Sequence, residues 1–129
     1  MRFILPAMLL IVGIIHLLPL SGVLSANRLQ KLYGIAVEDP NLEILMRHRA
    51  VLFGLLGVFL IAAAFLPSLQ LAALAAGFVS VVSFLYLAAA VGSFNEQINR
   101  VVIADKVAVI CLVLGAVAYV MNRLNADQI

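Results

Sequence analysis

Four apolar runs, each long enough or nearly long enough to cross a membrane, constrain this chain more than any other feature. They cover about residues 3–20, 41–66, 69–91 and 101–121. The hydrocarbon core of a bilayer is about 30 Å thick, and a helix needs about 20 apolar residues to cross it. We therefore expect an all-α integral membrane protein whose residues 1–129 form a single four-helix bundle.

The composition excludes the other broad classes of protein. Hydrophobic residues make up 66% of the chain and charged residues 11%, against about 45–50% and about 25% in a soluble domain. A disordered chain would need low hydrophobicity and high charge. The net charge of +2 is spread thinly, whereas nucleic-acid binding needs a concentrated basic surface. We expect membrane lipid, and no nucleic acid, as a partner.

Two stretches between the first and second runs carry helix signals. Asp39 followed by Pro40 is typical of an N-cap with proline at the first helical position. The second membrane helix should therefore start before its apolar run. Ser25 and Gly34 bound a short amphipathic stretch, which predicts an interfacial helix in the first long loop. A plain connecting loop is the alternative.

An even number of spans places both termini at one end of the bundle and the two long loops at the other. The loop end then carries six Lys or Arg residues, and the end with the termini carries two. Cytoplasmic loops collect Lys and Arg. This count predicts cytoplasmic loops with both termini outside.

The polar residues of the loop end form the candidate site, for ligand or partner binding rather than catalysis. An ionisable group inside a membrane helix costs free energy unless it is paired or functional. Guanidinium groups there could hold a phosphate or carboxylate bidentately. A structural ion-pair network and snorkelling of long side chains are the other interpretations. We expect a central cluster of Arg47, His48 and Asp105, with His16, Glu43 and Arg49 around it.

The two histidines allow a different interpretation of the same end. His16 and His48 fall near the loop ends of consecutive spans. They could ligate a haem from two helices, or serve a quinone headgroup or a proton relay. Without a carboxylate-rich set of partners they are a weak metal signal. We predict no metal site and no resident cofactor, and keep a quinone or haem as the alternative.

Small residues recur at helical spacing in three of the spans and predict close helix packing. The sequence does not indicate whether these faces pack inside one chain or against a protein partner or a second copy. Cys111 on such a face is expected to act as a small hydrophobic residue. The members are Gly54, Gly57 and Ala64; Ala72, Ala76 and Ser80; and Ala104, Ala108, Cys111, Gly115 and Ala118.

Three segments carry a family resemblance: GIIHLLPL from Gly13, EDPNLEILMRHRAVLFG from Glu38 and VVIADK from Val101. In these segments and in its layout the chain resembles small bacterial four-span proteins that are broadly DoxX-like. The resemblance implies a bacterial inner-membrane location. It implies no activity, because the function of that group is not established.

Some proteins of that group carry the label phosphopantetheine adenylyltransferase, and one motif of this sequence resembles a motif of that enzyme. Gly92-Ser93-Phe94-Asn95 looks like the GSFDP opening of that enzyme's phosphate-binding loop. The enzyme also needs an HxGH motif and an α/β nucleotide fold, and the sequence has neither. Other standard catalytic motifs are missing as well. We expect no adenylyltransferase activity and favour a protein that is not an enzyme.

These observations favour a small integral membrane accessory protein or subunit that binds a ligand or partner at its charged loop end. The alternative is a membrane redox or proton-transfer protein with a quinone or haem near His16 and His48. A small transporter comes third, and with four spans it would have to oligomerise.

Overall fold

The computed structural model describes residues 2–128, and within that range it contains helices and no strand. Four of the helices are long and apolar enough to cross a membrane, which confirms the predicted all-α membrane bundle. The elements are α1 (Ile4–Leu17), the 3-10 helix η1 (Leu18–Val23), α2 (Ala26–Tyr33), α3 (Pro40–Phe65), the 3-10 turn η2 (Pro67–Leu69), α4 (Gln70–Val91) and α5 (Glu96–Asp127).

Side-chain caps start α2, α3 and α5. The Asp39 carboxylate accepts a hydrogen bond from the backbone N–H of Asn41 at 2.8 Å, ahead of Pro40. The Ser25 hydroxyl accepts from Arg28 N–H at the start of α2, and Gly34 ends that helix in the left-handed conformation, with φ of 65°. The short helix in the first long loop is therefore present, with the cap residues expected of it.

Two helix ends differ from the predicted spans. The first span does not stop at Pro19 but continues as the tighter η1, because proline is tolerated in a first turn. The last helix starts at Glu96 and runs to Asp127, well beyond the predicted 101–121. Asn95 caps it by accepting from Ile98 N–H at 2.8 Å. The polar residues from Glu96 to Arg100 therefore lie on a helix and not in a loop.

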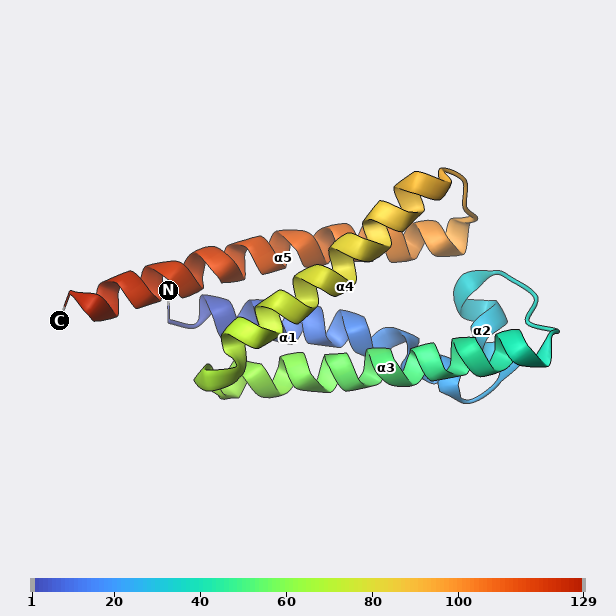
Figure 1. The fold of residues 1–129 in the computed structure, drawn as a ribbon, viewed down its shortest axis with the longest axis horizontal. Helices are drawn as coiled ribbons and strands as arrows, with labels where there is room; N and C mark the ends of the chain where they lie inside the picture. The colour runs from blue at the N-terminus through green and yellow to red at the C-terminus, as the bar shows by residue number, and fades with distance from the viewer. Residues whose placement is uncertain (1, 129) are drawn as a thin grey trace.

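The helices form a layer that α4 crosses (Figure 1). α1 packs against both α3 and α5, whereas α4 leaves α3 at the turn around Pro67 and crosses towards α5. Both termini lie at one end of the bundle. The segment between α1 and α3, which includes α2, and the short α4–α5 connection lie at the other end. We call these the terminal end and the loop end.

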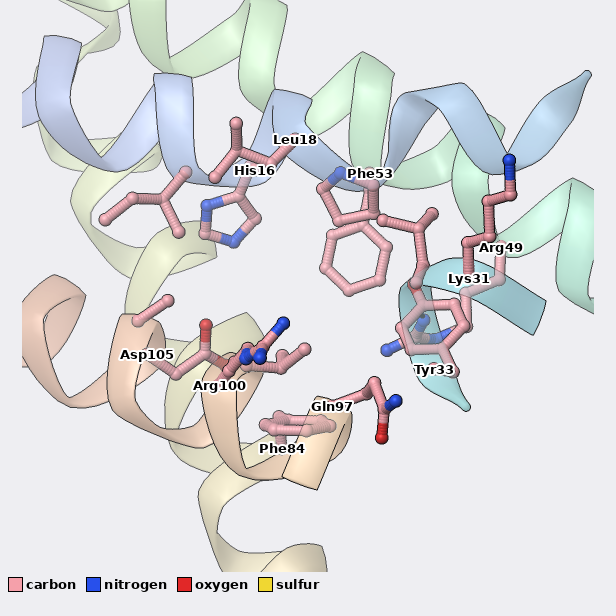
Figure 2. Close-up of a pocket in the computed structure, with 15 residues that line it drawn as sticks. His16, Leu18, Lys31, Tyr33, Arg49, Phe53, Phe84, Gln97, Arg100 and Asp105 are labelled. Carbon is pink, nitrogen blue, oxygen red and sulfur yellow. Dashed lines mark hydrogen bonds between the residues drawn. The ribbon is translucent and has the colours of Figure 1, made fainter. Parts of the chain in front are cut away.

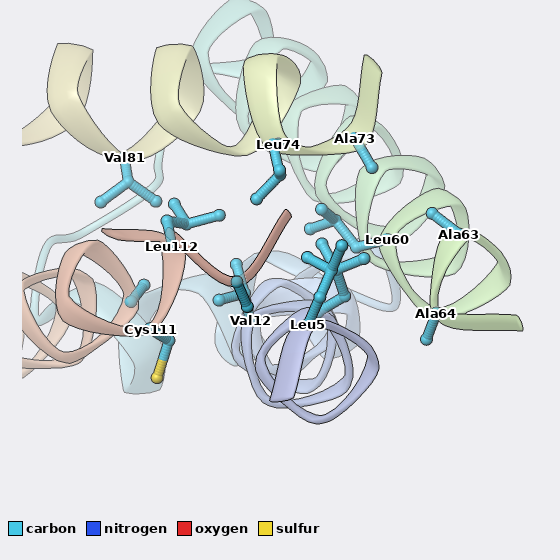
Figure 3. Packing of buried hydrophobic residues seen from close by; sticks show 13 residues of the cluster. Leu5, Val12, Leu60, Ala63, Ala64, Ala73, Leu74, Val81, Cys111 and Leu112 are labelled. Carbon is cyan, nitrogen blue, oxygen red and sulfur yellow. The ribbon is translucent and has the colours of Figure 1, made fainter. Parts of the chain in front are cut away.

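Glycines set the closest helix contacts in the terminal half. A Cβ atom on Gly57 of α3 would lie 2.9 Å from the carbonyl oxygen of Gly13 on α1. A Cβ atom on Gly77 of α4 would lie 3.0 Å from Leu112 of α5. Side chains such as Leu60 and Leu112 fill the space between the helices (Figure 3). Small residues allow this approach, as they do in other membrane bundles.

Most of the predicted small-residue faces are turned inward. Gly54, Gly57 and Ala64 of α3 are buried, and so are the members of the α5 stripe from Ala108 to Ala118. The face on α4 differs, because Ala72 is exposed and Ala76 is half-buried. The α3 and α5 stripes are thus seams within one chain.

Candidate functional site

A cavity of about 270 Å³ opens at the loop end between α1, α2, α3, α4 and α5. Its walls combine apolar and polar side chains that come from several helices, with His16 and Asp105 on opposite sides (Figure 2). The polar lining residues are His16, Lys31, Tyr33, Arg49, Gln97, Arg100 and Asp105. Three of these are cations and one is a carboxylate. Arg100 also pairs with Glu96 at 3.8 Å, so the excess of positive charge comes from Lys31 and Arg49.

Arg49 of α3 is the cation most firmly held in this cavity. Its Nη1 donates a 2.6 Å hydrogen bond to the hydroxyl of Tyr33 on α2. Its guanidinium carbon lies 5.2 Å from the centre of the Tyr33 ring and 4.5 Å from that of Phe53. Both distances suit cation–π interactions. Among residues 2–128 Arg49 forms no ion pair, so most of its donors remain open to a bound anion.

His16 of α1 lies deeper and is only 3% exposed. Its Nδ1 is 2.8 Å from the carbonyl oxygen of Val12, which can only accept, so Nδ1 carries a proton. Its Nε2 lies 3.0 Å from the Ser80 hydroxyl on α4. In the neutral ring that hydroxyl donates to Nε2. The ring of Phe53 lies 5.8 Å away. Both nitrogens of His16 are therefore occupied by the protein.

Asp105 of α5 faces the same cavity from the opposite wall. It is partly buried, and within the described range it makes no ion pair. A carboxylate in this position can accept a hydrogen bond from a ligand. The cavity thus presents a held guanidinium on one side and a free acceptor on the other.

The short helix α2 covers the loop end of the cavity, and Asn95 holds the last turn of α2 in place there. Asn95 Nδ2 donates to the carbonyl oxygen of Tyr33 at 2.6 Å and to that of Gly34 at 3.3 Å. Leu29 and Tyr33 of α2 are buried in a small apolar cluster against α3 and α5. The cap residue of α5 therefore also positions the ring that supports Arg49.

The six predicted site residues divide into two groups. His16, Arg49 and Asp105 line the cavity. Arg47 instead donates from Nε to the carbonyl oxygen of Val23 at 2.7 Å and pairs with Glu43 at 3.4 Å. His48 is exposed and does not line the cavity.

The predicted centre of Arg47, His48 and Asp105 is therefore not assembled. Successive residues of a helix point about 100° apart, so only one of three consecutive side chains on α3 can face the cavity. That residue is Arg49. Arg47 points to the end of η1, where it fixes the first loop to α3.

Several lining residues were not candidates from the sequence. Phe53 lies one helical turn after Arg49, and this i,i+4 spacing is a signal that could have paired them. Tyr33 is the last residue of the short amphipathic helix, next to Gly34. Ser80 was placed on the small-residue face of its span, and its hydroxyl contacts His16. The two residues are 64 positions apart in the sequence, and no local pattern indicates this contact.

The arrangement suits binding of a polar, anionic group better than metal ligation. Among residues 2–128 no group of three or more His, Cys, Asp and Glu side chains is placed to hold a metal ion. A haem held by two histidines would need His16 and His48 together, and they do not share the cavity. No family model, curated protein or solved structure matches this chain.

Proposed function

We propose that this protein is a small integral membrane accessory protein or subunit that binds an anionic amphiphile at its loop end. The observation that carries the proposal is Arg49. It is held between Tyr33 and Phe53 and faces the cavity. Among the described residues no carboxylate lies within ion-pair distance of it, and Asp105 across the cavity attracts it only at longer range. A buried or half-buried cation without a partner is costly in a membrane protein and marks a functional site by default.

The chemistry of the cavity favours a phosphate or carboxylate headgroup. Arginine presents donors in a planar fork that matches both anions bidentately. Lys31 adds positive charge where the cavity opens, and Asp105 can accept a hydrogen bond from the same ligand. The apolar remainder of the walls suits a ligand that comes from the membrane.

The test is a native mass spectrum of the tagged protein released gently from its native membrane. We expect additional mass that matches an anionic lipid, and expect Arg49→Gln to lose it. Arg28→Gln is the matched control, because Arg28 is exposed at the same end and does not line the cavity. A bare protein, or equal retention by both variants, would contradict the proposal. A stoichiometric polypeptide would instead make the chain a subunit whose partner supplies the function.

The second candidate is a quinone-dependent redox or proton-transfer role, and the His16–Ser80 pair favours it. A quinol hydroxyl that took the place of the Ser80 hydroxyl at His16 Nε2 could donate its proton to the imidazole. Mass that matches a quinone, dependent on His16 and not on Arg49, would favour this role over lipid binding.

We also propose the finer location. The loop end carries Arg28, Lys31, Arg47, Arg49, Arg100 and Lys106, and the terminal end carries Arg2 and Arg123. By the positive-inside rule the loops face the cytoplasm. The DoxX-like resemblance adds the bacterial inner membrane. Labelling of single cysteines at the two ends, in intact cells against broken cells, tests this orientation.

A further inference from the structure

A second hollow adjoins the cavity and lies between α3 and α4. It has a volume of about 330 Å³ and is lined by Leu52, Leu56, Ser80, Ser83 and Leu87, together with three residues that also line the first cavity. The shared residues are Arg49, Phe53 and Phe84. We call this hollow the α3–α4 groove. It shares a wall with the cavity at Arg49.

The course of α4 explains why the groove is there. α4 packs closely near Gly77, then diverges from α3 towards the loop end as it crosses to α5 (Figure 1). The side chains of Leu52 and Leu87 are 50% and 60% exposed. In a bundle this apolar, such exposed positions on membrane helices face lipid. The groove is therefore open sideways, to the membrane, and not only to the loop end.

From these features we infer that the ligand enters from the membrane between α3 and α4, with one apolar chain along the groove and an anionic headgroup at Arg49. The inference rests on the proposed function and specifies its ligand as a membrane lipid, not a water-soluble anion. Charge complementarity supports this occupant. The groove walls are apolar except at Ser80, Ser83 and Arg49, and the guanidinium stands where the headgroup would lie.

The two serines of the groove do not offer an anionic headgroup a free hydroxyl in place of Arg49. Ser83 donates its hydroxyl proton to the carbonyl oxygen of Ser80 at 3.0 Å. The Ser80 hydroxyl contacts His16. Both hydroxyls are thus engaged by the protein, and the free polar group of the groove is the guanidinium at its end.

The absence of tryptophan from the sequence allows a direct test. Leu87→Trp puts a single fluorophore in the groove, and Leu71→Trp puts one elsewhere on α4. Both leucines are 60% exposed, and Leu71 does not line the groove. Each variant is placed in phosphatidylcholine vesicles that contain the same small fraction of phosphatidylglycerol. Bromine on the acyl chains of one lipid or the other then quenches the fluorophore on contact.

If the groove holds the chain of an anionic lipid, brominated phosphatidylglycerol quenches the position-87 fluorophore in preference to brominated phosphatidylcholine. One charge-assisted interaction predicts about a tenfold enrichment of the anionic lipid. The preference disappears when Arg49→Gln is added. The position-71 fluorophore shows no preference. Leu52→Trp on the facing wall, with exposed Leu55→Trp as its control, repeats the test if the first variant does not fold.

The failures of the two proposals are distinguishable. If wild-type protein retains an anionic lipid through Arg49 but positions 87 and 52 show no preference, the lateral groove is wrong and the proposed function stands. Displacement of the lipid by glycerol phosphate at equal concentration would also contradict binding in the groove, because the acyl chain of the lipid would then add nothing to the affinity. If no anionic lipid is retained, both proposals fall.

Discussion

The two halves of this bundle are built from similar apolar sequence, but the terminal half is closely packed and the loop half encloses a cavity. In the terminal half, glycines bring helices together until a Cβ atom at Gly57 would lie 2.9 Å from the opposing backbone. In the loop half, α4 diverges and leaves a cavity lined by three cations and a carboxylate. The difference teaches that helices held together by small side chains leave no space between them, and that the divergence of α4 in the loop half is what leaves room for a ligand.

The largest expected effect tests the tight half. Gly57→Leu should destabilise the protein by about 2–3 kcal/mol, because overpacking at a close contact forces side chains and backbone to shift. The free energy of unfolding in mixed micelles measures this. Val58→Leu adds bulk at the next residue, which is 60% exposed, and should change little. Equal effects for the two variants would mean that the Gly13–Gly57 contact does not hold the bundle.

Arg49→Gln tests the open half. We expect affinity for the anionic lipid to fall by about ten- to a hundredfold, since a hydrogen bond to a charged group contributes about 1.5–3 kcal/mol. Titration of the lipid against purified protein measures the loss. The free energy of unfolding should change less than in Gly57→Leu. If Arg49→Gln instead lowers the free energy of unfolding strongly but leaves the affinity of the folded protein for the lipid unchanged, Arg49 supports the fold and does not bind the ligand.

Asn95→Ala tests the closure of the cavity by α2. It removes an N-cap and two hydrogen bonds to the end of α2, and an N-cap contributes about 1 kcal/mol. Hydrogen exchange should accelerate in α2 and in the first turn of α5, with the terminal half unchanged. Asn99→Ala, exposed one turn later, is the control. Uniform acceleration along all helices would show that the two halves do not open separately.

The smallest expected effect is at the boundary between the halves. Ser80→Ala removes the hydroxyl that joins α4 to His16, and such contacts between membrane helices contribute about 0.6 kcal/mol on average. Unfolding measurements on Ser80→Ala and on Ser83→Ala isolate it, because the Ser83 hydroxyl donates to the Ser80 carbonyl oxygen of its own helix. A loss near that of Gly57→Leu would make the His16–Ser80 contact a main support of the fold.

The fold was more predictable than the site. The membrane spans follow from hydropathy and length, and the caps at Asp39 and Ser25 follow from local hydrogen bonding. Both features can therefore be predicted from the sequence. The early start of α5 at Glu96 was missed because its first turn is polar, and the apolar pattern begins only at Val101. Asn95 gave a signal for that start, since asparagine is a favoured N-cap.

The candidate site needed the rotation of each helix about its axis. In a soluble helix the polar face gives that rotation. Here α3 is apolar on all sides through the membrane, so nothing in the sequence favours Arg49 over Arg47 or His48 as the residue that faces inward. The structure brings Arg49 to Tyr33 and Phe53 and sends Arg47 to Val23.

By itself the sequence determined that there are four membrane helices and at which end of the bundle each one begins. It also determined that the polar residues gather at one end. The physical reason is that a bilayer of fixed thickness sorts residues by depth, and depth follows from position along the chain. Only the tertiary structure decided which of those residues share a cavity and where α4 leaves it open. That depends on helix rotation and crossing, which are set by packing between residues far apart in the chain.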